Sequence, residues 1–574
     1  MSVSSLPFLH GALAAVLPKL AAWRRDFHAH PEAGWTEFRT AALIIRRLRE
    51  LGYAIRMGEA ACASDRRMGV PSSAVLAAAR ERALEHGADA ELVAGMGDGY
   101  TGFWADLDCG PGPVTAFRFD MDCNEVAECA EESHRPVREG FASRWPGLMH
   151  ACGHDGHAAV GLGLAEVLVS IRRHLRGRIR LIFQPAEEGA RGALPMSEAG
   201  AVDGVDVLFG FHIGFKAEGP GSLICGTQGF LATTKRDVLF SGVPAHAGAA
   251  PEEGKDALLA ACSAVVNLHA ISRNGKGGTR IAVGRLEGGE ARNVIPASAR
   301  LFMETRGETT ELDAYMAAES ERILRASADL WGCACEWRTV GNSAGGGSSP
   351  ELARLIATVA EAMGGWKTVI PMSGFGATED FACLMSRVQA SGGLASYLQV
   401  GTDRAAGHHS DRFDFDETCL GRALELLARL AVRMAGGGQE DTETETESDM
   451  EFLDEVVRRK GIHVQLWLEG EDGEGFGRGR VELLQLVDEL GSLSKAAKQL
   501  GMSYRGAWGK IKKAERIAGE TLVDASGTKR DGYSLTPAGR ELVQRFQQWY
   551  ADVESFAKKR AEAFYDCLVN EYGV

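Results

Sequence analysis

The densest set of metal-binding side chains in the sequence is the stretch His150-Ala-Cys-Gly-His-Asp-Gly-His157. Cys152 and His154 stand two residues apart around a glycine, and an apolar helical pattern follows over 158–168. A turn of this kind can direct a thiolate and an imidazole at one ion, because Cys, His and carboxylates are the usual ligands of zinc-like metals. Three His and one Cys within eight residues favour a metal site over a buried cysteine beside structural histidines.

Two adjacent carboxylates occur in Gln184-Pro-Ala-Glu-Glu-Gly189, directly after an apolar strand pattern. One of Glu187 and Glu188 can hold a metal while the other acts as a base. Metal-assisted hydrolysis needs both, because an activated water must also lose a proton. Taken alone, the same pair would more often be a solvated loop with two acids than part of an active site.

The other candidate side chains are His212, the pair Asp120 and Asp122, and His408-His409. A single His after a strand is more often structural than a ligand. Here, however, every candidate lies at the carboxyl end of a predicted strand or in a nearby loop. This joint placement predicts one shared site.

The strands that must position these residues are four apolar runs at 114–119, 179–183, 205–211 and 396–400. They alternate with helical patterns, which predicts an α/β fold with a mixed sheet flanked by helices. Ligands of such sheets bind beyond the carboxyl ends of the parallel strands. The active site is therefore expected at that edge.

A second unit interrupts the pattern between residues 234 and 345. Its strands are expected at 235–241, 279–286, 298–306 and 334–340, and its helices at 256–272 and 310–331. The order βαββαβ predicts a small ferredoxin-like α+β domain. The catalytic domain is then split into 1–233 and 346–435, with the glycine-rich run 341–347 as the return hinge.

The stretch 436–449, GGGQEDTETETESD, contains six acids, three glycines and no large apolar residue. Such a composition cannot bury a core, so it predicts an acidic, flexible linker. A separate C-terminal domain is expected over 450–574.

Composition limits the class of protein. A chain of 574 residues exceeds what one core organises, and its net charge of −15 argues against general affinity for nucleic acids or membranes. The twelve cysteines lack the spacing of a disulfide framework, which favours a reducing, cytoplasmic location. No stretch approaches the ~20 apolar residues of a membrane span. Residues 1–25 predict an amphipathic helix rather than a signal peptide.

Residues 480–545 predict a winged helix-turn-helix. Helices are expected at 480–490, 495–500 and 503–517, followed by two strands around a polar hairpin at 524–532. Between 491 and 530, nine Lys or Arg against three Asp or Glu leave a net charge of +6. The third helix would enter the major groove and the wing would meet phosphates. The basic face of a protein-interaction domain is the alternative.

From Trp23-Arg-Arg-Asp-Phe-His-Ala-His-Pro31 to the segment after His408, the sequence resembles the M20 family of metallopeptidases and amidohydrolases, in the branch with the HACGHD motif. Within that branch it is most similar to the A subunits of p-aminobenzoyl-glutamate hydrolases. The discriminating stretches are Arg67-Met-Gly-Val-Pro71, Gly99-Tyr-Thr-Gly-Phe103, Ser133-His-Arg-Pro136 and Gly140-Phe-Ala-Ser143.

This resemblance implies a binuclear metal site. The implied ligands of two divalent ions, Mn²⁺ or Zn²⁺, are Cys152, His154, Glu188, His212 and His409. Glu187 would be the general base that takes a proton from the attacking water and gives it to the leaving amine. Asp120 would orient a ligand from behind. The thiolate suggests zinc, whereas the carboxylate and imidazoles also suit manganese.

In the family, the inserted unit is a lid, or dimerisation domain. The resemblance implies that His246, Asn293 and Arg306 bind the substrate's carbonyl and carboxylate, with His246 reaching the other subunit's site. Arg suits this role because its guanidinium binds carboxylates bidentately; a surface charge at a strand end is the alternative. The expected substrate is an N-acyl amino acid, best p-aminobenzoyl-glutamate. A homodimer is expected, and the need for a homologous B subunit stays open.

The C-terminal segment resembles the N-terminal domain of molybdenum-dependent transcriptional regulators. The matching stretches are Gly491-Ser-Leu-Ser-Lys-Ala-Ala497, Met502-Ser-Tyr-Arg-Gly-Ala-Trp508 and Leu535-Thr-Pro-Ala-Gly-Arg540. The resemblance implies DNA contacts by Ser503, Tyr504, Arg505 and Lys510. A long helix at 537–565 would pair two copies on a palindromic site. No oxyanion-binding domain is expected, so molybdate sensing is not implied.

The sequence leaves two functions open. The chain is either an amidohydrolase with a DNA-binding regulatory module, or a transcriptional regulator whose hydrolase-like domain senses a ligand. The presence of Glu187 beside a full set of candidate ligands favours the enzyme, because a sensor could do without the base.

Overall fold

The computed structural model describes residues 6–435, 467–469, 475–500, 502–524 and 533–553. The chain divides into two compact units, Met1–Val457 and Arg458–Val574. Each unit is described by itself. The expected linker at 436–449 lies outside the described residues.

The first unit is built on an eight-stranded mixed sheet of order β1-β2-β4-β3-β5-β15-β6-β13. Its centre is formed by the four predicted strands, which are β3 (Val114–Asp120), β4 (Arg178–Gln184), β5 (Val207–Glu218) and β15 (Leu394–Thr402). These four are parallel neighbours. The outer strands are β1 (Ala54–Met57), β2 (Phe103–Asp108), β6 (Ser222–Ile224) and β13 (Thr368–Ile370). The predicted α/β class and mixed sheet are confirmed.

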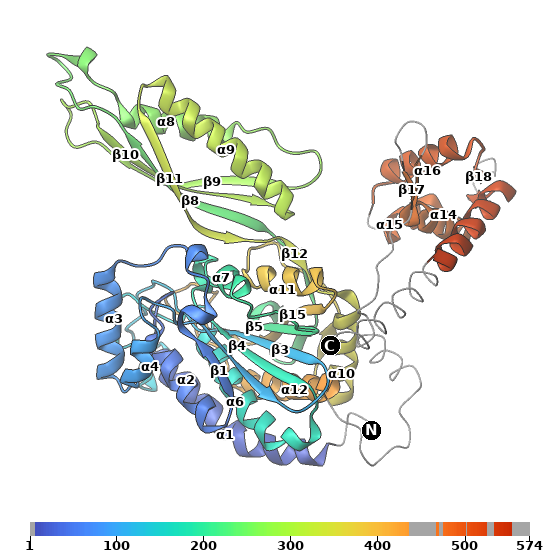
Figure 1. The fold of residues 1–574 in the computed structure, drawn as a ribbon, viewed down its shortest axis with the longest axis horizontal. Coiled ribbons are helices and arrows are strands. Elements are labelled where there is room, and N and C mark those ends of the chain that lie inside the picture. The colour runs from blue at the N-terminus through green and yellow to red at the C-terminus, as the bar shows by residue number, and fades with distance from the viewer. Residues whose placement is uncertain (1–5, 436–466, 470–474, 501, 525–532, 554–574) are drawn as a thin grey trace, which may run out of the picture. The chain divides into compact units, whose positions relative to one another are not determined.

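Helices cover both faces of this sheet (Figure 1). The larger core contains α1 (Pro7–Ala29), α2 (Phe38–Glu50), α6 (His154–Ser170), α10 (Pro350–Met363) and α12 (Thr418–Ala435). The smaller core contains α7 (Ala193–Glu198) and α11 (Phe381–Ala390). Helix α1 confirms the helix expected near the N-terminus. Helices α3 (Ser73–Glu85), α4 (Ala90–Gly95) and α5 (Arg135–Arg138) belong to long connections.

Helix α6 is the central helix and is buried from His154 to Leu168. It begins four residues before the predicted 158, because Gly153 takes the left-handed conformation (φ 89°) and turns the chain directly into the helix. A residue without a side chain is required where α6 crosses the sheet. A Cβ on Gly161 would lie 2.8 Å from the ring of Phe119 and 2.9 Å from the ring of Phe183.

The inserted unit is a four-stranded antiparallel sheet of order β11-β8-β10-β9, the ferredoxin-like order. Its strands are β8 (Ala232–Ser241), β9 (Thr279–Gly288), β10 (Ser298–Gly307) and β11 (Ala334–Ser343), and its helices are α8 (Ala257–His269) and α9 (Thr310–Leu330). All six predicted elements are present. Figure 1 shows both helices on one side of the sheet.

The expected hinge at 341–347 is largely strand. Strand β11 continues to Ser343, and β12 (Gly346–Gly347) pairs with β7 (Thr227–Phe230). The Asn342 N–H also donates to the Ala190 carbonyl at 2.8 Å. These hydrogen bonds fix the position of residues that the glycine content alone predicted to be a hinge.

The described part of the second unit has helices near the three predicted places, α14 (Arg478–Leu490), α15 (Leu493–Gln499) and α16 (Tyr504–Ala518). Serine side chains cap the last two: Ser492 accepts from the Lys495 N–H and Ser503 from the Gly506 N–H. Strands β18 (Val523–Asp524) and β19 (Ser534–Leu535) pair, and residues 537–553 are helical. A short pair that was not predicted, β16 (Trp467–Glu469) with β17 (Gly475–Gly477), precedes them. The hairpin tip at 525–532 and the predicted helix beyond 553 lie outside the described residues.

Among the helices that the structure describes, none combines the length and apolar character needed to cross a lipid bilayer.

We expect Gly161→Ala to lower the stability of the first unit by about 1–3 kcal/mol, because the added methyl group must displace packed rings. The melting temperature of the full-length protein would measure this. Gly11→Ala is the matched control: nothing lies within 4 Å of the new Cβ on α1, so the better helix former should preserve or slightly raise stability. Equal melting temperatures for the two variants would contradict the close packing of α6.

Candidate metal centre

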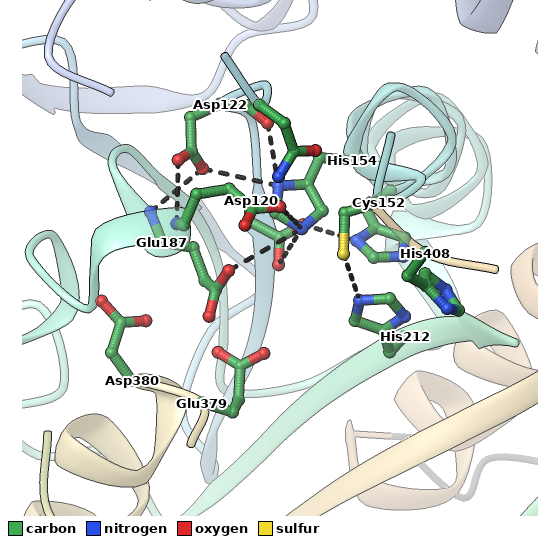
Figure 2. A network of polar contacts seen from close by, with 12 residues as sticks. Asp120, Asp122, Cys152, His154, Glu187, His212, Glu379, Asp380 and His408 are labelled. Carbon is green, nitrogen blue, oxygen red and sulfur yellow. Dashed lines mark hydrogen bonds and ion pairs between the residues drawn. The ribbon is translucent and has the colours of Figure 1, made fainter. Parts of the chain in front are cut away.

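The candidate residues meet at the carboxyl end of the parallel strands (Figure 2). Asp120 is the last residue of β3, and His212 lies within β5. Glu187 and Glu188 follow β4 in a single 3₁₀ turn, Glu187–Gly189. The first residue of α6 is His154, with Cys152 just before it. The structure therefore brings together residues that are up to about 290 positions apart, since His409 closes the same site (409 − 120 = 289).

Cys152 faces His212 across the site. The Cys152 Sγ lies 3.4 Å from the His212 Nε2, and the other ring nitrogen lies 2.9 Å from the Ile213 carbonyl. Burial, and then the nearby His157, hold the pKa of His212 well below its ordinary value, so its ring is neutral. Burial, followed by the charge of Glu188, raises the pKa of the Cys152 thiol well above normal. A thiolate here requires a cation beside it.

His154 and Glu188 offer ligand atoms that lack a hydrogen-bond partner. The His154 Nδ1 is 2.9 Å from the Asp122 carbonyl, which aims Nε2 into the site. This Nε2 and the Glu188 Oε1 are both buried without a hydrogen bond, and they lie 3.9 Å apart. Metal–ligand distances are about 2.0–2.2 Å, so one ion between these atoms would satisfy both. The residues therefore fit a divalent metal.

His409, rather than its neighbour His408, is open to this site. Its Nε2 lies 3.3 Å from the Glu188 Oε2. The left-handed backbone of His409 (φ 64°) is held by its N–H, which donates to the Ala151 carbonyl at 2.8 Å. Both ring nitrogens of His408 are engaged, with Arg404 at 2.9 Å and the Ile213 carbonyl at 3.2 Å. Burial lowers the pKa of His408 to about 3.

Three carboxyl groups hold the loop that carries Glu187 and Glu188. The Asp122 carboxylate accepts from both of their backbone N–H groups at 3.0 Å. Glu37 accepts from the Ala186 N–H, and Asp380 accepts from the Gly192 and Ala193 N–H groups. Asp122 was a sequence candidate for the site, but both of its carboxylate oxygens accept hydrogen bonds from this loop. It acts as a positioning residue.

Asp120 lies behind the candidate ligands. Its Oδ1 is 2.5 Å from the His157 Nδ1, and its Oδ2 is 3.7 Å from the His154 Nε2. Burial alone would raise the pKa of Asp120, but His154, His157 and Arg118 outweigh it and hold the pKa well below its ordinary value. Asp120 is therefore a fixed negative charge next to His154.

Sequence reasoning missed a buried charge network below the site. The Arg118 guanidinium, fully buried, donates to Asp120, Gln184, Glu379 and Asp380 at 2.6–3.2 Å. The Tyr397 hydroxyl donates to Glu379 at 2.6 Å. A signal was available: Arg118 interrupts an apolar strand between two phenylalanines, and the acidic pair directly precedes α11.

Acidic groups outnumber cations in this interior. The buried or half-buried carboxyls are Asp120, Asp122, Glu187, Glu188, Glu379 and Asp380, and Arg118 is the guanidinium among them. Burial, followed by the charges of Glu379 and Glu188, raises the pKa of Glu187 well above its ordinary value. Burial likewise raises the pKa of Asp380 to about 7. Uncompensated buried charge is costly, so this donor set suits added cations. Groups of ligand atoms within 4.8 Å of one another include Cys152, Glu188 and His409, and His154, Glu187 and Glu188.

The lid separates its three predicted substrate residues into two places. His246 and Asn293 lie together, since the Ala247 N–H donates to the Asn293 carbonyl at 2.9 Å and His246 bridges to Val294. Arg306 lies at the other end of the lid sheet, paired with Thr233 in register and ion-paired with Glu304 at 2.8 Å. One chain does not assemble the three around a single ligand.

The predicted DNA-contacting residues are exposed together at the start of α16. Ser503, Tyr504, Arg505 and Lys510 are all solvent-exposed. The Ser503 hydroxyl caps the helix, and the Tyr504 hydroxyl lies 2.9 Å from that of Tyr533. Arg505 and Lys510 therefore offer cationic side chains on this helix.

Two family models match the chain. Residues 116–433 match peptidase family M20/M25/M40, and residues 479–540 match the bacterial regulatory helix-turn-helix protein, lysR family. The second match confirms the helix-turn-helix prediction. The matching model is of the LysR type, whereas the motifs quoted above resemble those of molybdenum-dependent regulators.

Similar proteins span the first unit. The indole-3-acetyl-aspartic acid hydrolase of Enterobacter agglomerans is 44% identical over 429 residues, covering 74% of this chain and 98% of that protein. One of the p-aminobenzoyl-glutamate hydrolase subunits of Escherichia coli (strain K12) is 46% identical over 420 residues, covering 73% and 96%. The crystal structure of an aminobenzoyl-glutamate utilization protein from Klebsiella pneumoniae matches with a TM-score of 0.65 at 40% identity, covering 74% and 98%.

A Bacillus subtilis structure described as a dinuclear metal binding peptidase from the M20 family matches with a TM-score of 0.51 at 25% identity, covering 73% of this chain and 98% of that one. Its fold and family agree with the donor set assembled at the carboxyl edge of the sheet. This chain belongs to peptidase family M20/M25/M40, as a metal-dependent amidohydrolase joined to a bacterial regulatory helix-turn-helix domain.

Proposed function

We propose that this chain hydrolyses the amide bond of an N-acyl amino acid, with p-aminobenzoyl-glutamate as the best candidate substrate. The observation that carries the proposal is the pair of buried, unpartnered ligand atoms, His154 Nε2 and Glu188 Oε1, next to the Glu187 carboxyl. A metal site with an adjacent proton acceptor is the arrangement that amide hydrolysis requires.

In this proposal two divalent ions, Mn²⁺ or Zn²⁺, are held by Cys152, His154, Glu188, His212 and His409. When bound, they polarise the amide carbonyl and lower the cost of water attack at neutral pH. Glu187 accepts the proton of the attacking water and returns it to the leaving amine. Asp120 and Asp122 keep His154 and the Glu187 loop in place.

The substrate class follows from the relatives and from the lid. Two similar hydrolases are named for an aromatic acyl group joined to glutamate or aspartate. Such conjugates carry free carboxylates, which Arg, Asn and His side chains recognise through hydrogen bonds. Arg306, Asn293 and His246 are assigned to this recognition.

The proposal includes a homodimer, because one chain cannot bring those three residues together. Arg306 pairs with Thr233 near the start of β8, whereas His246 follows the end of that strand at Ser241. Eight residues of strand span about 26 Å at ~3.3 Å per residue. His246 and Asn293 therefore act on the site of the second subunit, and Arg306 on that of its own.

For the helix-turn-helix domain we propose a second function, which is to bind DNA and regulate transcription. The net charge of +6 over 491–530 supports it, and Ser503, Tyr504, Arg505 and Lys510 are the assigned contacts. The rival function, a ligand sensor without hydrolysis, predicts that the substrate binds and is not cleaved.

Metal-loaded protein should release glutamate from p-aminobenzoyl-glutamate, and Glu187→Gln should lower kcat at least 10²-fold because the proton acceptor is lost. Product release followed by chromatography measures the rate, with metal content determined in parallel. A chelator should abolish activity. Binding of the substrate without cleavage by the wild type would favour the sensor instead.

His246→Ala and Glu187→Ala should each be inactive, yet mixed dimers should regain activity, because one of their two sites then has both residues intact. Random reassortment predicts about a quarter of the wild-type rate for the whole mixture, and about half for mixed dimers isolated through both tags. The assay requires subunits mixed by co-expression with two affinity tags. An inactive mixed dimer, with each variant folded and metal-loaded, would contradict action across the interface.

Arg505→Ala should weaken binding to the protein's own promoter about tenfold at low salt, because a cation on the recognition helix is removed. A gel-shift titration measures the affinity. Arg322→Ala is the matched control, since Arg322 is an exposed lid residue paired with Glu319. The DNA-binding proposal fails if the wild type gives no shift.

A further inference from the structure

A cavity of about 760 Å³ opens beside the metal centre and contains an arginine that the proposed chemistry does not use. Glu188 and His409 line it, as does Arg191, which lies three residues after Glu188 on the same loop. Helix α3 forms another part of the wall through Val75, Ala78 and Ala79, among others. A substrate held at the metal ions would therefore reach this cavity directly.

The Arg191 guanidinium has no acidic partner among the residues that the structure describes. Its Nη1 donates to the Gly69 carbonyl at 3.1 Å, and its Nε is buried without an acceptor. Arg118 and Arg306 differ in this respect: Arg118 meets three carboxylates, and Arg306 is paired with Glu304. A half-buried guanidinium without a counter-charge is costly, and a ligand carboxylate would relieve that cost.

The backbone around Arg191 is shaped to hold it. A Cβ on Gly34 would lie 2.6 Å from its Nη2, and a Cβ on Gly69 would lie 2.9 Å from its Cδ. A Cβ on Gly189 would also collide with its Nε. Two glycines from distant segments, Gly34 and Gly69, and a third on the same loop, Gly189, thus lie against this one side chain. The Arg191 side chain is therefore packed between backbone segments and does not extend freely into solvent.

We propose that Arg191 binds the side-chain carboxylate of an acidic amino acid in the substrate, and so selects glutamate or aspartate conjugates over neutral ones. The inference rests on the proposed hydrolysis of N-acyl amino acids. A Cβ on Gly69 would also lie 3.1 Å from the Val340 carbonyl of β11, so Arg191 lies close to the base of the lid. That is where the amino-acid part is held if Arg306 takes the α-carboxylate.

Arg82 is the other arginine of the cavity, and its Nε is also buried without a hydrogen bond, so the neighbours of the two side chains distinguish them. Arg82 lies with its guanidinium 4.5 Å from the centre of the Trp145 ring, a cation–π contact. Glu125 is exposed at the cavity and forms no ion pair with Arg191 in the described structure. Arg191 is thus the cation adjacent to Glu188.

The test compares p-aminobenzoyl-glutamate with p-aminobenzoyl-glutamine, which differ only in the side-chain carboxylate. The full-length, metal-loaded enzyme is used, and kcat/KM is measured for each substrate. Loss of a charge-assisted hydrogen bond should lower kcat/KM of Arg191→Met on the glutamate substrate roughly 30- to 100-fold. The glutamine substrate should change less than about threefold, because it never used the charge. Arg191→Lys should retain part of the preference for the glutamate substrate, because lysine keeps the positive charge but cannot bind a carboxylate through two parallel hydrogen bonds.

Arg82→Met is the matched control, because it removes a cation from the same cavity. Its substrate ratio should equal that of the wild type. An equal loss on both substrates in Arg191→Met, or a lost preference in Arg82→Met alone, would overturn the inference while the hydrolase function stands.

Calorimetry with the uncleavable amines N-(4-aminobenzyl)-glutamate and N-(4-aminobenzyl)-glutamine separates the two proposals. If the wild type hydrolyses neither substrate, the proposed function fails. A preference for the glutamate amine that disappears in Arg191→Met would still support the carboxylate site. No preference in the wild type would overturn it.

Discussion

The organising constraint of the first unit is an excess of buried negative charge at one edge of its sheet. Carboxyl groups from β3, the turn after β4 and the segment before α11 converge there, and Arg118 is the guanidinium that meets them. Such a cluster is unfavourable unless cations balance it. The protein alone leaves His154 Nε2 and Glu188 Oε1 without hydrogen-bond partners. Divalent ions would supply both the missing charge and the missing contacts.

The same acids also serve as hydrogen-bond acceptors for the backbone. Ala186 and Ala190 adopt left-handed conformations at either end of the Glu187–Gly189 turn, which costs a non-glycine residue about 1–2 kcal/mol each. Asp122, Glu37 and Asp380 accept from the backbone N–H groups of this loop. Their hydrogen bonds offset the strain. A strained loop held in this way presents the Glu187 carboxyl beside the candidate metal ligands.

The lid imposes a second constraint, because its central strands are ten residues long. Its near end is joined to the catalytic loop through Asn342 and Ala190. Its far end carries His246 and Asn293. In a single chain these ends cannot serve the same small molecule, so dimerisation would complete the site. Arg306 and Arg191 are the two proposed carboxylate-binding side chains on the near side. Arg306 is already paired with Glu304, whereas Arg191 has no acidic partner within the part of the chain that the structure describes.

The sequence by itself determined the class of fold, the elements of the lid, the helix-turn-helix and the ligand candidates, because periodicity and short motifs are local signals. Residue types alone could not separate His408 from His409, although the family resemblance pointed to His409. They also could not show that the Asp122 carboxylate accepts hydrogen bonds from the Glu187 loop. The sequence also gave no reason to single out Arg191. Its side chain packs closely against Gly34, Gly69 and Gly189, which only the folded chain brings together. Only the tertiary structure decided these points. Whether a polar atom has a partner depends on which distant segments fold against it.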